Sequence, residues 1–156
     1  MAYSALDVAK YIVNYANNNH EGITHLQLQK ILYYAQATFL VDHDKELFEE
    51  PIRAWKHGPV IRDVYTRYAS WASLSISEIR KPNEKISKND CSVLERVVDI
   101  FICNTGWKLV EMTHKDLPWL EVYNGGKGKN NEITQQRISD YYKLPENKGK
   151  LNGIYG

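Results

Sequence analysis

The side chains that could carry out chemistry include five histidines and two cysteines, and their spacing limits the possible reactions. A metal site usually draws paired ligands from one element, yet no H-x-x-x-H pair occurs, and Cys91 and Cys103 lack a C-x-x-C partner. The densest cluster, Asp42-His43-Asp44, is more typical of a solvated helix end than of a ligand set. The sequence therefore predicts neither a metal ion nor another cofactor.

Motifs for nucleophilic catalysis and nucleotide binding are also missing. There is no G-x-S-x-G, and both cysteines fall in a helical pattern that suits small buried side chains. Residues 125–131 (GGKGKNN) contain glycines and lysines, but no apolar strand precedes them as in a phosphate-binding loop. These observations favour a protein that is not an enzyme. The alternative is a small enzyme with an unfamiliar site around His57, Asp63 and His114.

Length and charge limit the classes of partner. The 156 residues suffice for one domain, and the net charge of +1 provides no overall field toward nucleic acid or anionic lipid. The helix expected over 26–41 has a single basic residue, Lys30, so direct DNA binding is not expected. No signal peptide and no apolar run of about 20 residues is found, so we expect no membrane partner and a cytoplasmic location.

Capping residues and apolar periodicity predict a mainly α fold. Thr24 and Gln27 form a capping box, and apolar residues then recur at helical spacing to residue 41. Gly58-Pro59 is expected to open another helix, because proline suits the first helical position. We expect a compact single-domain bundle of about six helices. A small two-stranded β element is expected around 52–56 and 75–80.

The expected domain covers residues 4–142, and the polar, glycine-rich residues 143–156 are expected to form a flexible C-terminal tail. The chain has eleven tyrosines and four tryptophans but only three phenylalanines. Tyrosine and tryptophan bury a large area with few rotatable bonds and are common anchors of protein interfaces. Some of these rings belong in the core, but their number favours a protein that binds another protein.

Three segments carry a family resemblance. They are Ile23–Gln36 (ITHLQLQKILYYAQ), Leu47–Val60 (LFEEPIRAWKHGPV) and Leu109–Trp119 (LVEMTHKDLPW). In this order they resemble the Panacea domain, also called SocA-like or GepA-like, an antitoxin domain of bacterial and prophage toxin–antitoxin systems. The AW-x-x-GPV element of the second segment is the most specific of the three motifs. The resemblance extends over about residues 4–142.

The resemblance implies an antitoxin that binds a cognate protein toxin and blocks it, with many such toxins directed against translation. An alternative within the family is a proteolytic adaptor that delivers the toxin to a bacterial AAA+ protease. Family members often carry an additional N-terminal DNA-binding module. Because the first expected helix begins at about Ser4, autoregulation by direct DNA contact is not expected for this chain.

The candidate partner-binding residues lie in the second and third segments, where proline and aromatic residues form two corners of the chain. Two interpretations stay open: the corners border the partner-binding surface, or they pack helices together. Exposed lysine, arginine and histidine side chains would form the polar rim of such a surface. The candidates are Trp55, Lys56, His57, Gly58, Pro59, Arg62, His114, Pro118 and Trp119.

Overall fold

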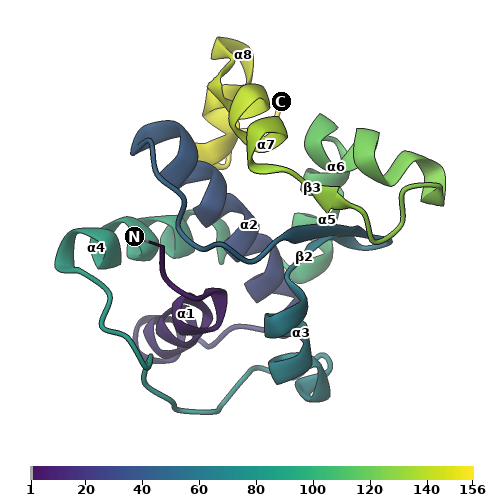
Figure 1. Cartoon of the computed structure of the whole chain (residues 1–156). Coiled ribbons are helices and arrows are strands. Elements are labelled where there is room, and N and C mark those ends of the chain that lie inside the picture. Colours follow the sequence, from purple (N-terminus) through teal and green to yellow (C-terminus); the bar gives the residue numbers. More distant parts are fainter. Residues whose placement is uncertain (1) are drawn as a thin grey trace.

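The structure is a computed structural model that describes residues 2–156, and it is mainly α-helical (Figure 1). This confirms the expected fold class, with more helices than expected because the C-terminal residues are also helical. The α-helices of the described residues are α1 (Ala5–Asn19), α2 (His25–Asp42), α3 (Arg62–Tyr68), α4 (Lys88–Phe101), α5 (Gly106–His114), α6 (Leu117–Tyr123), α7 (Gln135–Lys143) and α8 (Pro145–Lys148).

Short-range capping contacts begin several of these helices where the sequence predicts. The Thr24 side chain accepts a hydrogen bond from the Gln27 N–H, and the Gln27 side chain accepts one from the Thr24 N–H. Ser4 of α1, Ser87 of α4 and Thr134 of α7 each also accept a hydrogen bond from the backbone N–H three residues later, without the reciprocal bond of the box. Each cap provides an acceptor for an N–H that the helix itself leaves unpaired. The predicted capping box of α2 is confirmed.

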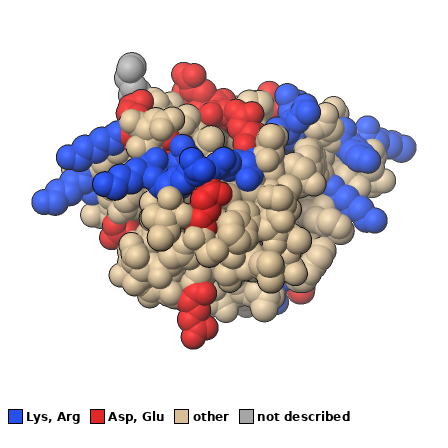
Figure 2. All heavy atoms as spheres, turned by 90° about the horizontal axis from the view of Figure 1, so that it is seen from below, with Lys and Arg blue, Asp and Glu red and all other residues tan. Residues whose placement is uncertain are grey.

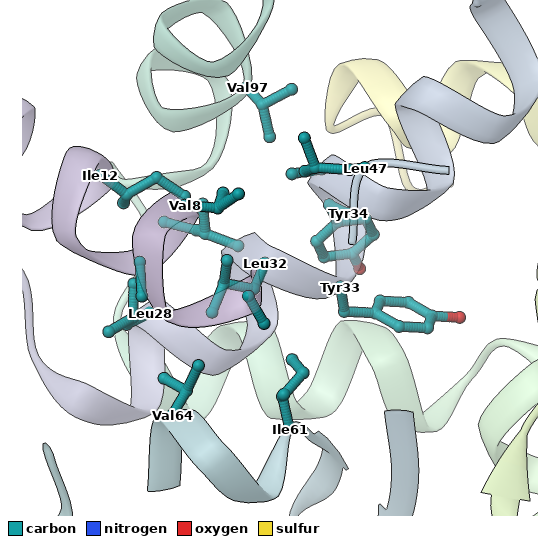
Figure 3. Packing of buried hydrophobic residues seen from close by; sticks show 14 of the residues in the cluster. Val8, Ile12, Leu28, Leu32, Tyr33, Tyr34, Leu47, Ile61, Val64 and Val97 are labelled. Atoms are coloured by element: carbon teal, nitrogen blue, oxygen red, sulfur yellow. The ribbon is translucent and has the colours of Figure 1, made fainter. Parts of the chain in front are cut away.

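Helix α2 is the centre of the molecule. It packs against α1, α3, α4, α5 and α7, and residues 28–39 are buried on every side. Figure 3 shows Leu28, Leu32 and Tyr34 from α2 meeting Val8 and Val97 from other helices. A helix enclosed in this way buries even its polar residues, which must then find partners inside the protein.

The small sheet differs from the sequence prediction. Strand β1 (Ile52–Trp55) lies between β2 (Gly58–Val60) and β3 (Glu132–Ile133), and both pairings are antiparallel. The predicted pairing of 52–56 with 75–80 is therefore wrong. Ser75 instead forms an isolated bridge with Thr24, and residues 76–80 are not a strand. A two-residue turn joins β1 to β2, which takes one edge of β1, and β3 takes the other edge, so no edge of β1 is left for residues 75–80.

Gly58 and Pro59 do not open a helix, which corrects a second prediction. Both lie in β2, and α3 begins only at Arg62. Gly58 has φ +104°, a backbone conformation that glycine adopts without a steric penalty. Proline lacks an N–H, so it is tolerated in an edge strand such as β2.

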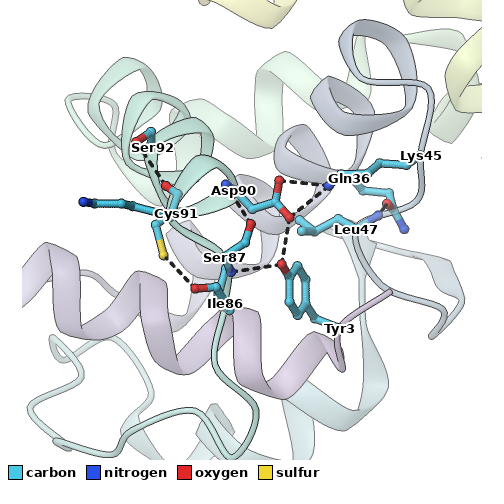
Figure 4. A network of polar contacts seen from close by, with 10 residues as sticks. Tyr3, Gln36, Lys45, Leu47, Ile86, Ser87, Asp90, Cys91 and Ser92 are labelled. Atoms are coloured by element: carbon cyan, nitrogen blue, oxygen red, sulfur yellow. Dashed lines mark hydrogen bonds and ion pairs between the residues drawn. The ribbon is translucent and has the colours of Figure 1, made fainter. Parts of the chain in front are cut away.

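The N-terminal residues are fastened to α4 and to the loop after α2 (Figure 4). The Tyr3 hydroxyl donates to Asp90 Oδ2 at 2.7 Å and accepts from the Ser87 N–H at 3.1 Å. Lys45 Nζ donates to both carboxylate oxygens of Asp90, at 2.9 and 3.0 Å. This network joins segments far apart in the sequence into one domain.

Residues 143–156, expected to be a flexible tail, fold onto the domain in the structure. Helix α8 is followed by a 3-10 helix, η3 (Gly149–Asn152), and Leu151 is buried. Tyr155 reaches back into the protein, where its hydroxyl bonds to Tyr34 and Asp116. The composition of this segment suggested a tail because its anchors are single residues separated by polar ones.

Within residues 2–156, none of the helices combines the length and the apolar character needed to cross a membrane.

Candidate functional site

A buried lysine marks the site. Lys30 of α2 has no solvent exposure, although it carries an amine. Its Nζ donates to the Pro59 carbonyl oxygen at 3.1 Å, the only hydrogen-bond acceptor that residues 2–156 offer it. Burial lowers the pKa of Lys30 from 10.5 to about 7, because the charged form loses its hydration. A lysine in this setting is costly, so its presence calls for a functional or structural reason.

All three segments of the family resemblance meet at Lys30. The first segment contributes the lysine itself, and the second contributes Gly58 and Pro59. A side-chain carbon placed at Gly58 would lie 2.8 Å from Lys30 Cε and 2.9 Å from Thr113 Oγ1, and Thr113 belongs to the third segment. Motifs separated by tens of residues thus form one compact centre around the amine.

Replacing Gly58 by alanine is expected to destabilise the domain by about 1–3 kcal/mol, since the positive φ and the two close contacts would both be strained. Urea unfolding followed by circular dichroism would measure the loss. Gly125→Ala is the matched control, because Gly125 also has positive φ but its added carbon would meet nothing within 4 Å. An equal loss in the two variants would show that crowding at Lys30 contributes nothing.

Lys30 lies beneath a pocket with a volume of about 390 Å³, a size typical of binding sites for small molecules or inserted side chains. Its walls are largely aromatic or imidazole rings, and its rim carries two further lysines. Trp55 contacts Tyr65, and His57 contacts Trp107, each with the two rings edge to face. The lining residues are His25, Leu26, Gln29, Lys30, Trp55, Lys56, His57, Val60, Tyr65, Ala72, Trp107 and Lys129. We call it the Lys30 pocket.

Two histidines near the pocket, His25 and His114, favour the neutral form. Burial, assisted by the charge of Lys30, lowers the pKa of His25 from 6.5 to about 4. The same two causes lower the pKa of His114. His25 Nε2 lies 3.0 Å from the Gln29 amide nitrogen, which a neutral ring can accept from. At neutral pH His25 and His114 therefore add little positive charge to this region.

A second, more open pocket of about 660 Å³ adjoins the first, and Trp55, Tyr65 and Lys129 line both. Its remaining walls include Arg62 and Asn130, and Asn130 Oδ1 accepts a hydrogen bond from the Trp55 indole N–H at 3.1 Å. Trp55 is thus held in place between the two pockets while part of its ring stays exposed. Among the described residues, neither pocket is lined by aspartate or glutamate.

The structure separates the other sequence-predicted candidates. Trp119 is buried; its indole N–H donates to the Trp55 carbonyl oxygen at 2.8 Å, and its ring stacks on His114 with 3.9 Å between centroids. Through these contacts Trp119 and His114 hold the backbone at Trp55 in place from the interior side. Pro118 is buried and faces a different depression, together with Glu121 and Tyr141. The nine candidates are therefore two groups: Trp55, Lys56, His57 and Arg62 at the surface, and Gly58, Pro59, His114, Pro118 and Trp119 mainly beneath or beside it.

The alternative of an enzyme site at His57, Asp63 and His114 finds no shared cleft. His57 lines the Lys30 pocket, whereas Asp63 lines a separate depression beside Glu50 and Arg53. His114 lines neither and stacks on Trp119 instead. Residues 2–156 also contain no group of three or more His, Cys, Asp or Glu side chains arranged to hold a metal ion.

Many of the aromatic residues serve the core. Tyr33, Tyr34, Tyr68 and Tyr142 are among the largest fully buried side chains. The exceptions are informative: Trp107 is 61% exposed and Tyr65 is 42% exposed, and both line the Lys30 pocket. The aromatic residues that could anchor an interface thus lie together on one face.

Comparison with known proteins identifies the family of the chain. The model of the family described as "Antitoxin SocA-like, Panacea domain" matches residues 28–120, more than half of the chain. The chain belongs to the SocA-like Panacea family. Its matched region includes Lys30, Gly58 and Thr113, and excludes His25 and Lys129.

A curated relative, Antitoxin SocA of Caulobacter vibrioides (strain NA1000 / CB15N), is 44% identical over 48 residues. This alignment covers 31% of the Panacea chain described above and 26% of the relative, so about a quarter of the relative is matched. No solved structure matches the chain.

Sequence reasoning missed the floor of the site and part of its wall. In the sequence, Lys30 differs from the rest of its expected helix only in being the single basic residue, and no motif selects Trp107 or Lys129. The available signal was that Lys30 sits within the family motif, between apolar positions of an otherwise buried helix. Apolar periodicity could not identify Lys30, because α2 is buried on all sides and its polar residues are not confined to one side of the helix.

Proposed function

We propose that this Panacea protein neutralises a cognate toxin by binding it directly through the face that contains the Lys30 pocket. The observation that carries the proposal is the gathering of Trp55, Tyr65 and Trp107 around one pocket with a basic rim. Exposed aromatic residues that are held in place lose little conformational entropy on binding, which suits them as anchors.

Family membership and the geometry of the pocket walls are two independent observations that support this face as the toxin-binding surface. The Panacea region contains Trp55, Lys56 and His57, and the supporting contacts from Trp119 hold this corner rigid. A rigid scaffold with an exposed rim can keep its fold while the contact residues adapt to a particular toxin. The second and third motifs then maintain the corner, and the side chains above it meet the partner.

The test is a growth assay in which the protein encoded by the adjacent gene is induced alone and together with this one. We expect toxicity that co-expression abolishes, and a return of toxicity with Trp107→Ala, whose side chain is too exposed to be needed for folding. Leu74→Ala is the matched control, because Leu74 is 67% exposed and lines none of the pockets described above.

Rescue that survives Trp107→Ala would place the binding surface elsewhere, and toxicity without rescue would contradict the proposal as a whole. Toxin abundance separates the two routes to neutralisation. Blocking leaves the amount of toxin unchanged in a pulse-chase experiment, whereas delivery to a protease shortens its lifetime.

A further inference from the structure

We propose that the Lys30 pocket receives a segment of the partner protein in which an aromatic or branched apolar side chain stands next to an aspartate or glutamate. The inference rests on the proposed function in one respect: the occupant is a protein. It goes further by assigning the chemistry of the segment, with the apolar side chain in the pocket and the carboxylate at its basic rim.

The walls require an apolar occupant. Leu26, Val60 and Ala72 line the pocket together with the rings of Trp55, Tyr65 and Trp107. Water against such walls is displaced favourably by an apolar group, at roughly 25 cal/mol for each Å² removed from solvent. A large residue left 61% exposed, as Trp107 is, has the most additional area to bury when a partner arrives.

The charges require a neighbouring carboxylate. Lys30 lies at the floor, Lys56 and Lys129 lie at the rim, and Arg62 borders the adjoining pocket. No acidic residue among those described lines either pocket. The salt bridges described for residues 2–156 include none that involves Lys30, Lys56, Lys129 or Arg62. The positive field of the exposed Lys56 and Lys129 is therefore available to a partner. Lys30 contributes less, because it is buried, and Arg62 also borders the depression that Glu50 and Asp63 line.

This local charge exists although the whole chain is nearly neutral. Seen from below, Lys and Arg side chains form a band across one face, with Asp and Glu side chains beside it and between its parts (Figure 2). A net charge of +1 accordingly says little about any one face. An acidic apolar segment matches the pocket, whereas a basic segment would meet like charges, which disfavours its binding.

The first test is independent of any toxin. Random heptapeptides displayed on phage are selected on the purified protein, and the enriched peptides are then measured against variants by fluorescence anisotropy. We expect enrichment of an aromatic, leucine or isoleucine residue beside Asp or Glu. The double variant Lys56→Glu, Lys129→Glu is expected to weaken these peptides by about 30-fold, since it reverses the rim charge.

The double variant Lys81→Glu, Lys127→Glu is the matched control. It changes the net charge equally, both lysines are exposed, and Lys127 lies in the same loop as Lys129 but outside the pocket. Affinity within about threefold of the wild type is expected for this control, because exposed charges outside a contact act only through screened fields. Selection without enrichment, enrichment of neutral or basic peptides, or an equal loss in both double variants would overturn the inference.

The second test uses the protein encoded by the adjacent gene and separates this inference from the proposed function. Binding of that protein to the wild type, with loss only in the rim variant, supports both. Binding that the rim variant retains leaves the antitoxin function intact and overturns the pocket assignment. If that protein does not bind while the acidic peptides do, the proposed function fails for this pair and the pocket assignment stands.

Discussion

Replacing Asp116 by alanine is expected to destabilise the domain by about 3–5 kcal/mol, because it leaves a partly buried cation, the buried Tyr142 hydroxyl and the partly buried Tyr155 hydroxyl without their shared acceptor. Asp116 has no solvent exposure. Its Oδ2 accepts from the Tyr142 hydroxyl at 2.6 Å and from the Tyr155 hydroxyl, and its Oδ1 accepts from Lys150 Nζ at 2.9 Å. A single carboxylate thus fastens α7 and the C-terminal residues to the domain.

The surrounding groups depend on this carboxylate. Burial lowers the pKa of Lys150, but hydrogen bonds to Tyr141 and Asp116 outweigh burial and raise the pKa overall. Burial, together with the neighbouring Tyr34 hydroxyl and Asp116 carboxylate, raises the pKa of Tyr155, so its hydroxyl stays protonated and donates. Without the carboxylate, the ammonium and the hydroxyls lose an acceptor that water cannot easily replace.

Urea unfolding at pH 7, followed by fluorescence and circular dichroism, measures this effect. Asp140→Ala is the control, because Asp140 is exposed and accepts only from the Gln136 side chain at 2.7 Å; its change should stay within about 0.5 kcal/mol. A loss below 1 kcal/mol for Asp116→Ala would contradict the role assigned to the network. Limited proteolysis should also cut Asp116→Ala first near residues 143–156, which lose their main anchor.

Replacing Lys30 by methionine is expected to have the opposite effect on stability, raising it by about 2–4 kcal/mol at pH 7. Methionine has a similar length and no charge to desolvate. The pKa of Lys30 falls from 10.5 to about 7 on folding, so the folded state disfavours the proton that the unfolded chain holds readily. Part of the gain is offset, because the Pro59 carbonyl oxygen loses its donor.

The gain should depend on pH in a defined direction. Because the folded pKa lies below the unfolded one, the unfolded state binds more protons between about pH 7 and 10.5, and the wild type becomes more stable as the pH rises through this window. The advantage of Lys30→Met is therefore full below pH 7 and shrinks toward pH 10. Measuring between pH 7.5 and 9.5 excludes titration of the neighbouring His25 and His114 as a source of the slope, because the pKa of each is lowered.

Thermal or urea unfolding of both proteins across this range provides the measurement, and binding of the selected acidic peptides provides the second readout. Lys108→Met is the control, since Lys108 is half exposed and should show no comparable pH dependence. A stabilised variant that has lost at least tenfold in peptide affinity would identify Lys30 as a residue kept for binding at the expense of stability. A destabilised variant with a flat pH profile would show that the amine is structural.

The sequence by itself determined the features that depend on residues close together in the chain. The Thr24–Gln27 box, the serine cap at Ser87 and the end of α6 at Asn124 each rest on contacts over three or four residues, so their signals are local. The mainly α class and the family followed from such signals and from three contiguous motifs. The surface candidates Trp55, Lys56 and His57 also came from one motif, and their role in binding stays a prediction.

Only the tertiary structure decided which residues meet. Arg53 pairs with Glu132 across β1 and β3, and Lys30 meets Gly58 and Thr113, yet nothing in the local sequence favours these partners over others. The Gly58-Pro59 pair fits both a helix start and an edge strand, and the hairpin with Ala54 and Trp55 selected the strand. Burial of Lys30 and Asp116 arises because several elements close around them, and such enclosure is a property of the packed whole.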